Sequence, residues 1–263
     1  MSMVDTRLYP QHAAASREIA FIDPGVADLG DLLRGLRPEV HAIVLSPAGN
    51  PVRQMADALD RTGELRAIHI IAHGASGEIA FTAGPVSLAT ISAGARDLAR
   101  IGAALDIDGE LLLWSCETGR GARGERFIDA LSRNTGALVA ASTGIVGAAA
   151  KGGSWKLDTS FGATIAAPLT PIGILTFTGV MTAFSWTGPG GTAIKPVSGT
   201  WSTTTNWSPN GTPGSADTVT LGGNNSAAGA YTVTLDTSPT VTTLTISATK
   251  GATLAVGAHT LTV

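Results

Sequence analysis

The sequence predicts an α/β domain with a mostly parallel sheet, followed by an all-β segment. Through residues 18–167, short apolar runs alternate with segments whose apolar residues recur at helical spacing. Beyond residue 183 the pattern changes to short stretches in which apolar and small polar residues alternate. Because strand–helix–strand connections are right-handed, the first part should form a parallel sheet with helices on both faces.

Five apolar runs are short enough to be buried strands, and helical patterns separate them. A strand order of 2-1-3-4-5 would make the first, third and fourth strands neighbours. A small hairpin is expected within 79–88, and an edge strand at 155–157. The expected strands are 19–22, 40–45, 67–72, 111–114 and 137–141, and the expected helices are 26–36, 52–59, 91–105 and 122–135.

Composition argues against several classes of protein. A net charge of -3 is a poor match for a nucleic acid or an anionic membrane. No apolar run reaches the roughly 18–20 residues of a membrane span, and the amino terminus lacks the apolar core of a secretory signal. The single Cys allows no intrachain disulfide. The histidines lack metal-ligand spacing, so we expect no metal and no cofactor.

The distribution of charge marks a domain boundary. All thirteen Arg precede residue 134, and only four charged residues follow residue 182, where twenty Thr are found. We therefore expect a linker near the prolines at 168 and 171. The expected units are a flexible arm at 1–17, an α/β domain at 18–167, a linker at 168–182 and a β-rich repeat segment at 183–263.

The β-rich segment repeats short strands at roughly ten-residue spacing, split by small residues. This spacing favours a β-solenoid, and a plain β-sandwich is the alternative. The pattern runs to Val263 without a cap, and solenoids need several coils and a cap. We therefore expect this segment to be truncated from a longer protein.

Two residues able to carry chemistry follow expected strands. His73 comes after the strand at 67–72, and Cys116 after the strand at 111–114. Carboxyl ends of parallel strands form the ligand-binding edge of such sheets, and a thiol needs a nearby base to become a nucleophile. We expect the sulfur to lie within about 4–7 Å of a ring nitrogen. The alternative is a buried, inert Cys and a structural His.

The motifs around these residues resemble a known family. His73-Gly74 after one strand and Ser115 to Gly119 after a later one look like caspase-like (clan CD) cysteine peptidases, and the second motif is similar to the CHAT branch. The stretch 18–167 more closely resembles an uncharacterised domain near the amino terminus of very large bacterial adhesin-like proteins. The fold implied is caspase/flavodoxin-like, and the segment after residue 183 resembles the entry turns of β-helix adhesins.

The resulting hypothesis is a cysteine endopeptidase. Cys116 attacks the scissile carbonyl and His73 carries the proton to the leaving amine. The backbone N–H groups of Gly74 and Cys116 are expected to form the oxyanion hole.

The resemblance also implies a substrate pocket beside the first strand. A carboxylate at Asp23 would favour Lys or Arg before the scissile bond, with Ser142 and Thr143 as neutral walls. The alternative is that Asp23 caps the Pro24-Gly25 turn.

The expected partner is a protein or peptide substrate, including the longer chain of this protein itself. The resemblance to adhesins implies a cell-surface or extracellular location reached without an N-terminal signal peptide, and a cytoplasmic location is the alternative. A catalytically silent interaction module of an adhesin is the second functional hypothesis. A flavodoxin-like small-ligand binder is the third, although no phosphate-binding loop is present.

Overall fold

The structure is a computed structural model of the chain. The expected arm at 1–17 lies, except for Arg17, outside the described residues. The structure describes residues 17–26, 28–159, 165–181, 183–192, 195–208, 212–214, 217–222, 229–241 and 243–263.

A five-stranded parallel sheet forms the centre of the first part, which confirms the predicted α/β class and its strand order. The fourth and fifth predicted strands are β7 and β8, because the labels β4 to β6 belong to a separate three-stranded sheet. In spatial order the strands are β2 (Val40–Val44), β1 (Glu18–Ile22), β3 (Leu65–Ile71), β7 (Leu105–Trp114) and β8 (Leu138–Ala141).

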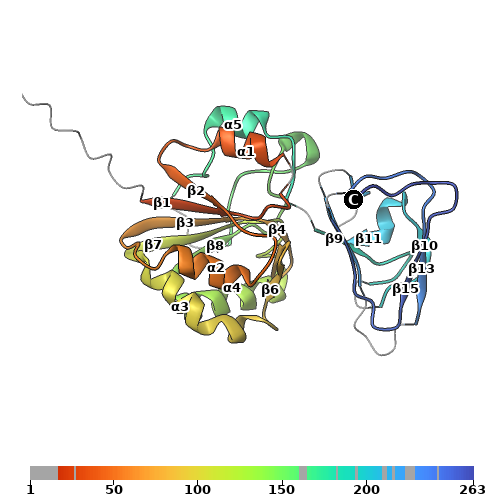
Figure 1. The fold of residues 1–263 in the computed structure, drawn as a ribbon, viewed down its shortest axis with the longest axis horizontal. Coiled ribbons are helices and arrows are strands. Elements are labelled where there is room, and N and C mark those ends of the chain that lie inside the picture. Colours follow the sequence, from red (N-terminus) through yellow and green to blue (C-terminus); the bar gives the residue numbers. More distant parts are fainter. Residues whose placement is uncertain are drawn as a thin grey trace, which may run out of the picture.

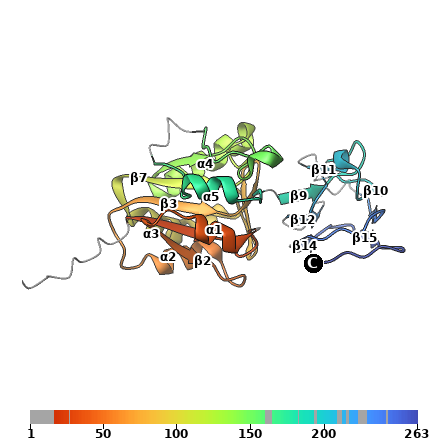
Figure 2. The same ribbon diagram turned by 90° about the horizontal axis from the view of Figure 1, so that it is seen from above.

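Helices lie on both faces of this sheet. Figure 1 shows α1 and α5 on one face and α2, α3 and α4 on the other, and in the view from above in Figure 2 α1 and α5 lie in front of the strands. The helices are α1 (Leu29–Gly35), α2 (Pro51–Ala58), α3 (Ala95–Ala103), α4 (Gly121–Thr135) and α5 (Pro171–Thr176), with short 3₁₀ turns η1 (Ile91–Gly94) and η2 (Ala149–Lys151).

The alternation of side chains along the strands creates two cores. On β1, Ile19 and Phe21 belong to the core beneath α2, α3 and α4, whereas Ala20 and Ile22 belong to the core on the other face. All four side chains are buried, as expected for strands of a sheet covered on both sides.

Several local predictions differ from the structure. The predicted helix 91–105 is a 3₁₀ turn followed by α3, which ends at Ala103, and β7 begins at Leu105 rather than residue 111. The first helix begins at Leu29 rather than residue 26, because Asp28 adopts a left-handed conformation with φ 50° and the chain turns there. Residues 155–157 form no strand; their neighbour Ser154 makes only an isolated bridge to Val146.

A small antiparallel sheet lies beside the carboxyl edge of the main sheet. The predicted hairpin is present, and His73 begins an additional strand that pairs with it. The strands are β4 (His73–Ala75), β5 (Glu78–Phe81) and β6 (Gly84–Ser87).

Residues 165–181 belong to the α/β domain. The helix α5 lies against α1, and Thr170 N–H donates to Gly35 O at 2.8 Å. Leu169, Phe177 and Met181 are buried in the same core as β1. The segment expected as a linker therefore carries part of the packed domain.

The segment from residue 183 onward contains small sheets in which most neighbouring strands are parallel. Its described strands enclose a core in which the Trp186 and Trp201 rings both lie edge-on to Trp207. No solenoid is detected in the described residues. The elements are β9 (Ala183–Trp186), β10 (Gly199–Thr200), η3 (Thr204–Asn206), β11 (Trp207–Ser208), β12 (Thr218–Leu221), β13 (Tyr231–Thr234), β14 (Thr243–Ile246) and β15 (Ala252–Ala255).

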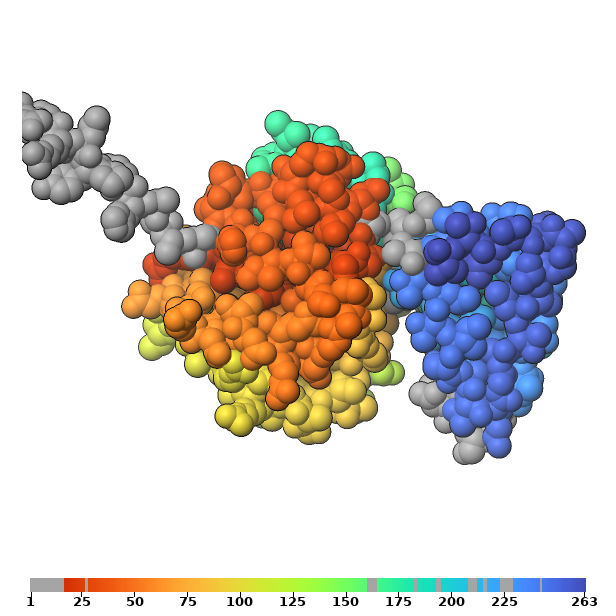
Figure 3. Space-filling model, viewed as in Figure 1, coloured from red at the N-terminus to blue at the C-terminus, as the bar shows by residue number. Residues whose placement is uncertain are grey.

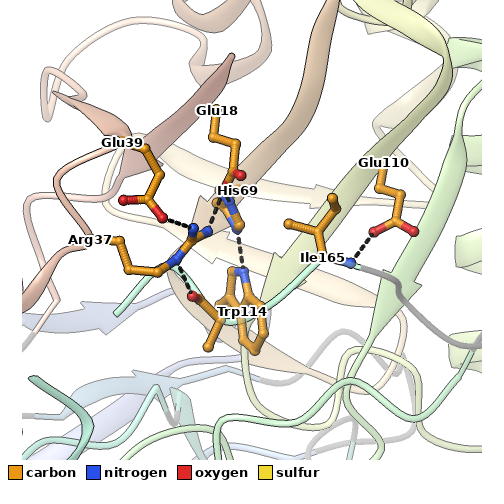
Figure 4. A network of polar contacts seen from close by, with 8 residues as sticks. Glu18, Arg37, Glu39, His69, Glu110, Trp114 and Ile165 are labelled. Carbon is orange, nitrogen blue, oxygen red and sulfur yellow. Dashed lines mark hydrogen bonds and ion pairs between the residues drawn. The ribbon is translucent and has the colours of Figure 1, made fainter. Parts of the chain in front are cut away.

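A buried polar network ties β1, β3 and β7 together (Figure 4). Trp114 Nε1–H donates to His69 Nδ1 at 3.0 Å, and His69 Nε2 lies 3.2 Å from the Glu18 carboxylate, which also pairs with Arg37. Because Nδ1 is an acceptor here, Nε2 carries the proton. His69 therefore has a structural role.

Burial lowers the pKa of His69, against the opposing influence of Glu18. Burial alone would raise the pKa of Glu18, but the hydrogen bonds from His69 and Arg37 overcome it and the pKa lies below its usual value. At both groups the folded state therefore binds fewer protons than the unfolded chain in mild acid.

We expect folding stability to fall as the pH decreases from about 6.5 to about 4, the ordinary His and Glu range. His69→Gln should reduce the loss of folding stability at about pH 6.5, the upper end of this range. His41→Gln, at an exposed position on β2, is the matched control and should leave it unchanged. Urea unfolding of Cys116→Ala chains across this range measures the effect. Equal slopes for the two His variants would contradict the role of His69.

Candidate active site

The register of the sheet brings three chain segments to one edge. Ile22 pairs with Ile71, and Ile71 pairs with Trp114, so β1, β3 and β7 end at the same level. Asp23, His73 and Cys116 follow these strand ends within two residues. The convergence predicted from the sequence is therefore present in the backbone.

The imidazole of His73 is held by the loop that follows β1. His73 Nε2 lies 3.0 Å from the Gly25 carbonyl oxygen. A carbonyl only accepts, so Nε2 carries the hydrogen, and Nδ1 of the neutral ring is the nitrogen able to take up a proton. This contact fixes both the tautomer and the orientation of the ring.

Gly74 approaches the loop after β7 too closely for any side chain. A Cβ at this position would lie 2.7 Å from the Cys116 carbonyl oxygen, 2.7 Å from Ser115 Cβ and 2.6 Å from Thr118 Oγ1. The absence of a side chain therefore allows the backbones of β4 and of the cysteine loop to lie side by side.

The thiol of Cys116 contacts a neighbouring backbone. Val146 N–H donates to the sulfur at 3.1 Å, and the thiol lies 3.6 Å from Val146 O. An N–H donor to sulfur stabilises a thiolate more than a thiol. The next residue, Glu117, has φ 57°, an unfavourable conformation for a residue other than Gly that turns the chain directly after the cysteine.

The two N–H groups expected to form an oxyanion hole share one acceptor. Gly74 N–H and Cys116 N–H donate to the carbonyl oxygen of Met181 at 3.1 and 3.2 Å. The two donors thus point at one carbonyl, the arrangement that stabilises an oxyanion in acyl transfer.

Met181 ends a short strand-like segment that pairs with residues 146–148. Ala148 N–H donates to Gly179 O at 2.8 Å, and Met181 N–H donates to Val146 O at 2.9 Å. These bonds flank the antiparallel bridge between Gly147 and Val180.

This pairing places the sulfur beside the Met181 carbonyl. In a regular antiparallel ladder, Val146 N–H would donate to Met181 O and complete a hydrogen-bonded pair. Here that N–H donates to the sulfur of Cys116, and Met181 O accepts from Gly74 and Cys116 instead. The sulfur of Cys116 therefore accepts the hydrogen bond that Met181 O would accept in a regular ladder. Its distance from the imidazole stays a prediction.

Sequence reasoning did not find Val146 or Met181. Neither residue lies in a motif, and Met181 falls within the stretch expected to be a linker. The buried apolar residues at 177, 180 and 181 were the available signal, since an exposed linker does not need them.

Asp23 uses its carboxylate to hold the surrounding turn. Its oxygens accept from Thr82 N–H at 2.9 Å, Thr82 Oγ1–H at 2.8 Å and Gly25 N–H at 3.1 Å. These contacts favour the capping role, and they position the Gly25 carbonyl that orients His73.

Ser142 and Thr143 form a turn after β8. Ser142 is buried, and its hydroxyl contacts the backbone of Gly144. Thr143 is exposed and bonds to Asp158 through its N–H and its hydroxyl. The contacts described for these residues fix this turn, from which Gly144 O accepts the N–H of Glu117.

The candidate site is covered. His73 is 0% exposed and Cys116 is 1% exposed. The strand β9 of the β-rich segment contacts β4. Burial raises the pKa of Asp217 in that segment, against the backbone hydrogen bond from Gly214 and the charges of His73 and Lys151. The β-rich segment therefore lies next to the strand that begins with His73. Figure 3 shows it beside the α/β domain, with an open gap below the zone where they meet.

The described residues include no group of three or more His, Cys, Asp or Glu that could hold a metal ion. Within the same residues, no helix is long and apolar enough to cross a membrane.

Comparison with known families gives one match. Residues 19–181 match the family model of a domain of unknown function, DUF4347. No curated protein and no solved structure matches the chain. The match ends at the residue whose carbonyl lies in the candidate site.

Gly74→Ala should destabilise the fold by about 1–3 kcal/mol, because the added Cβ would overlap the cysteine loop. Gly144→Ala is the matched control: its Cβ would meet nothing within 4 Å, and we expect a change within about 0.5 kcal/mol. Urea unfolding of Cys116→Ala chains measures both. Equal stabilities would show that β4 and the loop have room to separate.

Proposed function

Because the chain belongs to the DUF4347 family of domains of unknown function, its function has to be argued from the site, and we propose a cysteine endopeptidase. Cys116 is the nucleophile and His73 the general base and acid. The substrate is a protein or peptide bound in extended form. The single observation that carries the proposal is the convergence of Gly74 N–H and Cys116 N–H on one peptide carbonyl.

The geometry supports this chemistry in three respects. Two backbone donors are directed at a carbonyl oxygen, where negative charge develops in the tetrahedral intermediate. The sulfur belongs to the residue that supplies one of these donors. The imidazole is held in the tautomer whose Nδ1 can accept the thiol proton.

In the proposed reaction, His73 takes the proton of the Cys116 thiol as the sulfur bonds to the carbonyl carbon. The oxyanion is held by the N–H groups of Gly74 and Cys116. The C–N bond then breaks, the leaving amine takes the proton from His73, and a thioester remains. Water hydrolyses this thioester, releasing a carboxylate and restoring the thiol.

The catalytically silent interaction module remains the second candidate. Burial of both His73 and Cys116 favours it, because an active site must admit a substrate. The two candidates differ in thiol chemistry. A peptidase thiol depends on His73, whereas an inert buried thiol does not.

We also propose a surface-protein setting. Parallel strands rich in Thr pair in register, with Thr218 opposite Thr243 and Thr220 opposite Thr245. This pairing supports reading the β-rich segment as the first coils of a β-solenoid of the adhesin type. On this proposal the protein is a bacterial cell-surface or extracellular protein.

Peptide chloromethyl ketones should alkylate Cys116 in the whole chain. His73→Gln should slow this labelling by at least about 100-fold, because general-base assistance contributes about that much. His41→Gln is the matched control and should label like the unaltered chain. Mass spectrometry of the labelled peptide gives the rate and the site.

Ketones carrying Met or Lys next to the reactive group test the role of Asp23. If Asp23 only holds the turn, Lys should give no advantage. Labelling of Cys116 at the same measurable rate in His73→Gln and His41→Gln would refute the peptidase and leave the silent module.

A further inference from the structure

We infer that this site acts on its own chain and that the scissile bond is the peptide bond following Met181. The inference rests on the proposed peptidase function and adds the bond, the substrate class and the intramolecular route. The observation that carries it is that the carbonyl held by Gly74 N–H and Cys116 N–H belongs to Met181.

Residues 179–181 lie in the site as a peptide substrate would. They pair antiparallel with residues 146–148 through two backbone hydrogen bonds. Addition of an extended segment to an exposed strand is a common mode of peptide binding, in which backbone bonds supply affinity and side-chain pockets supply selectivity. The segment reaches the thiol at Met181, where the regular ladder stops.

The Met181 side chain defines the substrate class. It is 0% exposed and belongs to the apolar cluster that contains Cys116, Val146, Trp155 and Phe177. Such an apolar cluster accepts an unbranched, flexible apolar side chain and disfavours a charge. The preferred substrate is therefore an extended segment with Met or a similar residue before the scissile bond.

The surroundings favour cleavage within one chain. The β-rich segment begins with β9 at Ala183, only two residues beyond Met181. β9 contacts β4, the strand that begins with His73. An added peptide would have to displace Met181 from the N–H groups of Gly74 and Cys116, whereas the chain's own carbonyl is already bound by them.

The reaction follows the scheme above with defined products. The sulfur of Cys116 bonds to the Met181 carbonyl carbon, and the bond to the nitrogen of Thr182 breaks. His73 transfers the thiol proton to that nitrogen, which becomes a new amino terminus. Water then hydrolyses the thioester, leaving a carboxylate at Met181 and a thiol at Cys116.

The whole chain should therefore convert to residues 1–181 and a fragment that begins with Thr182. Intact-mass spectrometry and amino-terminal sequencing identify the bond. Cys116→Ala should remain intact. The half-life should not change over a 100-fold range of protein concentration, and the unaltered chain should not cut the Cys116→Ala chain. Cleavage that accelerates with concentration would overturn the intramolecular route.

Variants of Met181 separate a substrate from a structural contact. Met181→Leu conserves volume and should be cut within about 10-fold of the original rate. Met181→Asp places a charge in the apolar cluster and should be cut at least about 100-fold more slowly. By displacing the segment, it should also label faster with a Met chloromethyl ketone. Leu175→Asp, at an 83% exposed position on α5, is the matched control and should be cut normally.

The outcomes distinguish this inference from the proposed function. If the whole chain stays intact while Met181→Asp labels at Cys116 in a His73-dependent manner, the peptidase stands and the Met181 segment is an inhibitor, which overturns the inference. Cleavage at another bond also overturns it. If neither cleavage nor His73-dependent labelling occurs in any variant, the proposed function itself fails. His73-dependent labelling of Met181→Asp also shows that this variant folds, because the thiol of an unfolded chain would react without help from His73.

Discussion

The candidate site depends on three neighbouring strands that stop at the same level. Because Ile22, Ile71 and Trp114 are in register, the segments that follow them leave the sheet together. One carries the Gly25 carbonyl that orients His73, one carries His73 and Gly74, and one carries Cys116. A slip of one residue in any strand would turn its side chains to the other face and separate these groups.

This arrangement requires support on both sides of the strand ends. The hydrogen bonds from Trp114 to His69 and from His69 to Glu18 join β7, β3 and β1 within the core on one face. At the edge itself, the positive φ of Glu117 costs about 1–3 kcal/mol of strain. The buried network is well suited to hold β7 while the loop after it adopts this conformation.

The sequence was sufficient for the parallel sheet and for the strand ends that carry His73 and Cys116, because apolar runs and helical spacing are local signals. It was insufficient for the backbone hydrogen bonds of Met181, whose partners lie at least 35 positions away in the chain. Pro168 and Pro171 also favoured a linker, although Pro171 in fact begins α5, a position at which proline is common. The role of Asp23 depended on Thr82, which no local pattern connects to it.

Whether a peptide in this position is a substrate or an inhibitor depends on how its contacts change during the reaction. The bonds from Gly74 and Cys116 to Met181 O measure 3.1 and 3.2 Å, within the range of about 2.7–3.2 Å that is normal for N–H···O hydrogen bonds. Negative charge on that oxygen would shorten and strengthen them. Contacts that are weak to the ground-state carbonyl and strong to the oxyanion lower the barrier to attack, whereas contacts already optimal in the bound peptide would only tighten binding. Met181 is therefore a substrate if these N–H groups bind the oxyanion more tightly than the carbonyl, and an inhibitor if they bind both equally well.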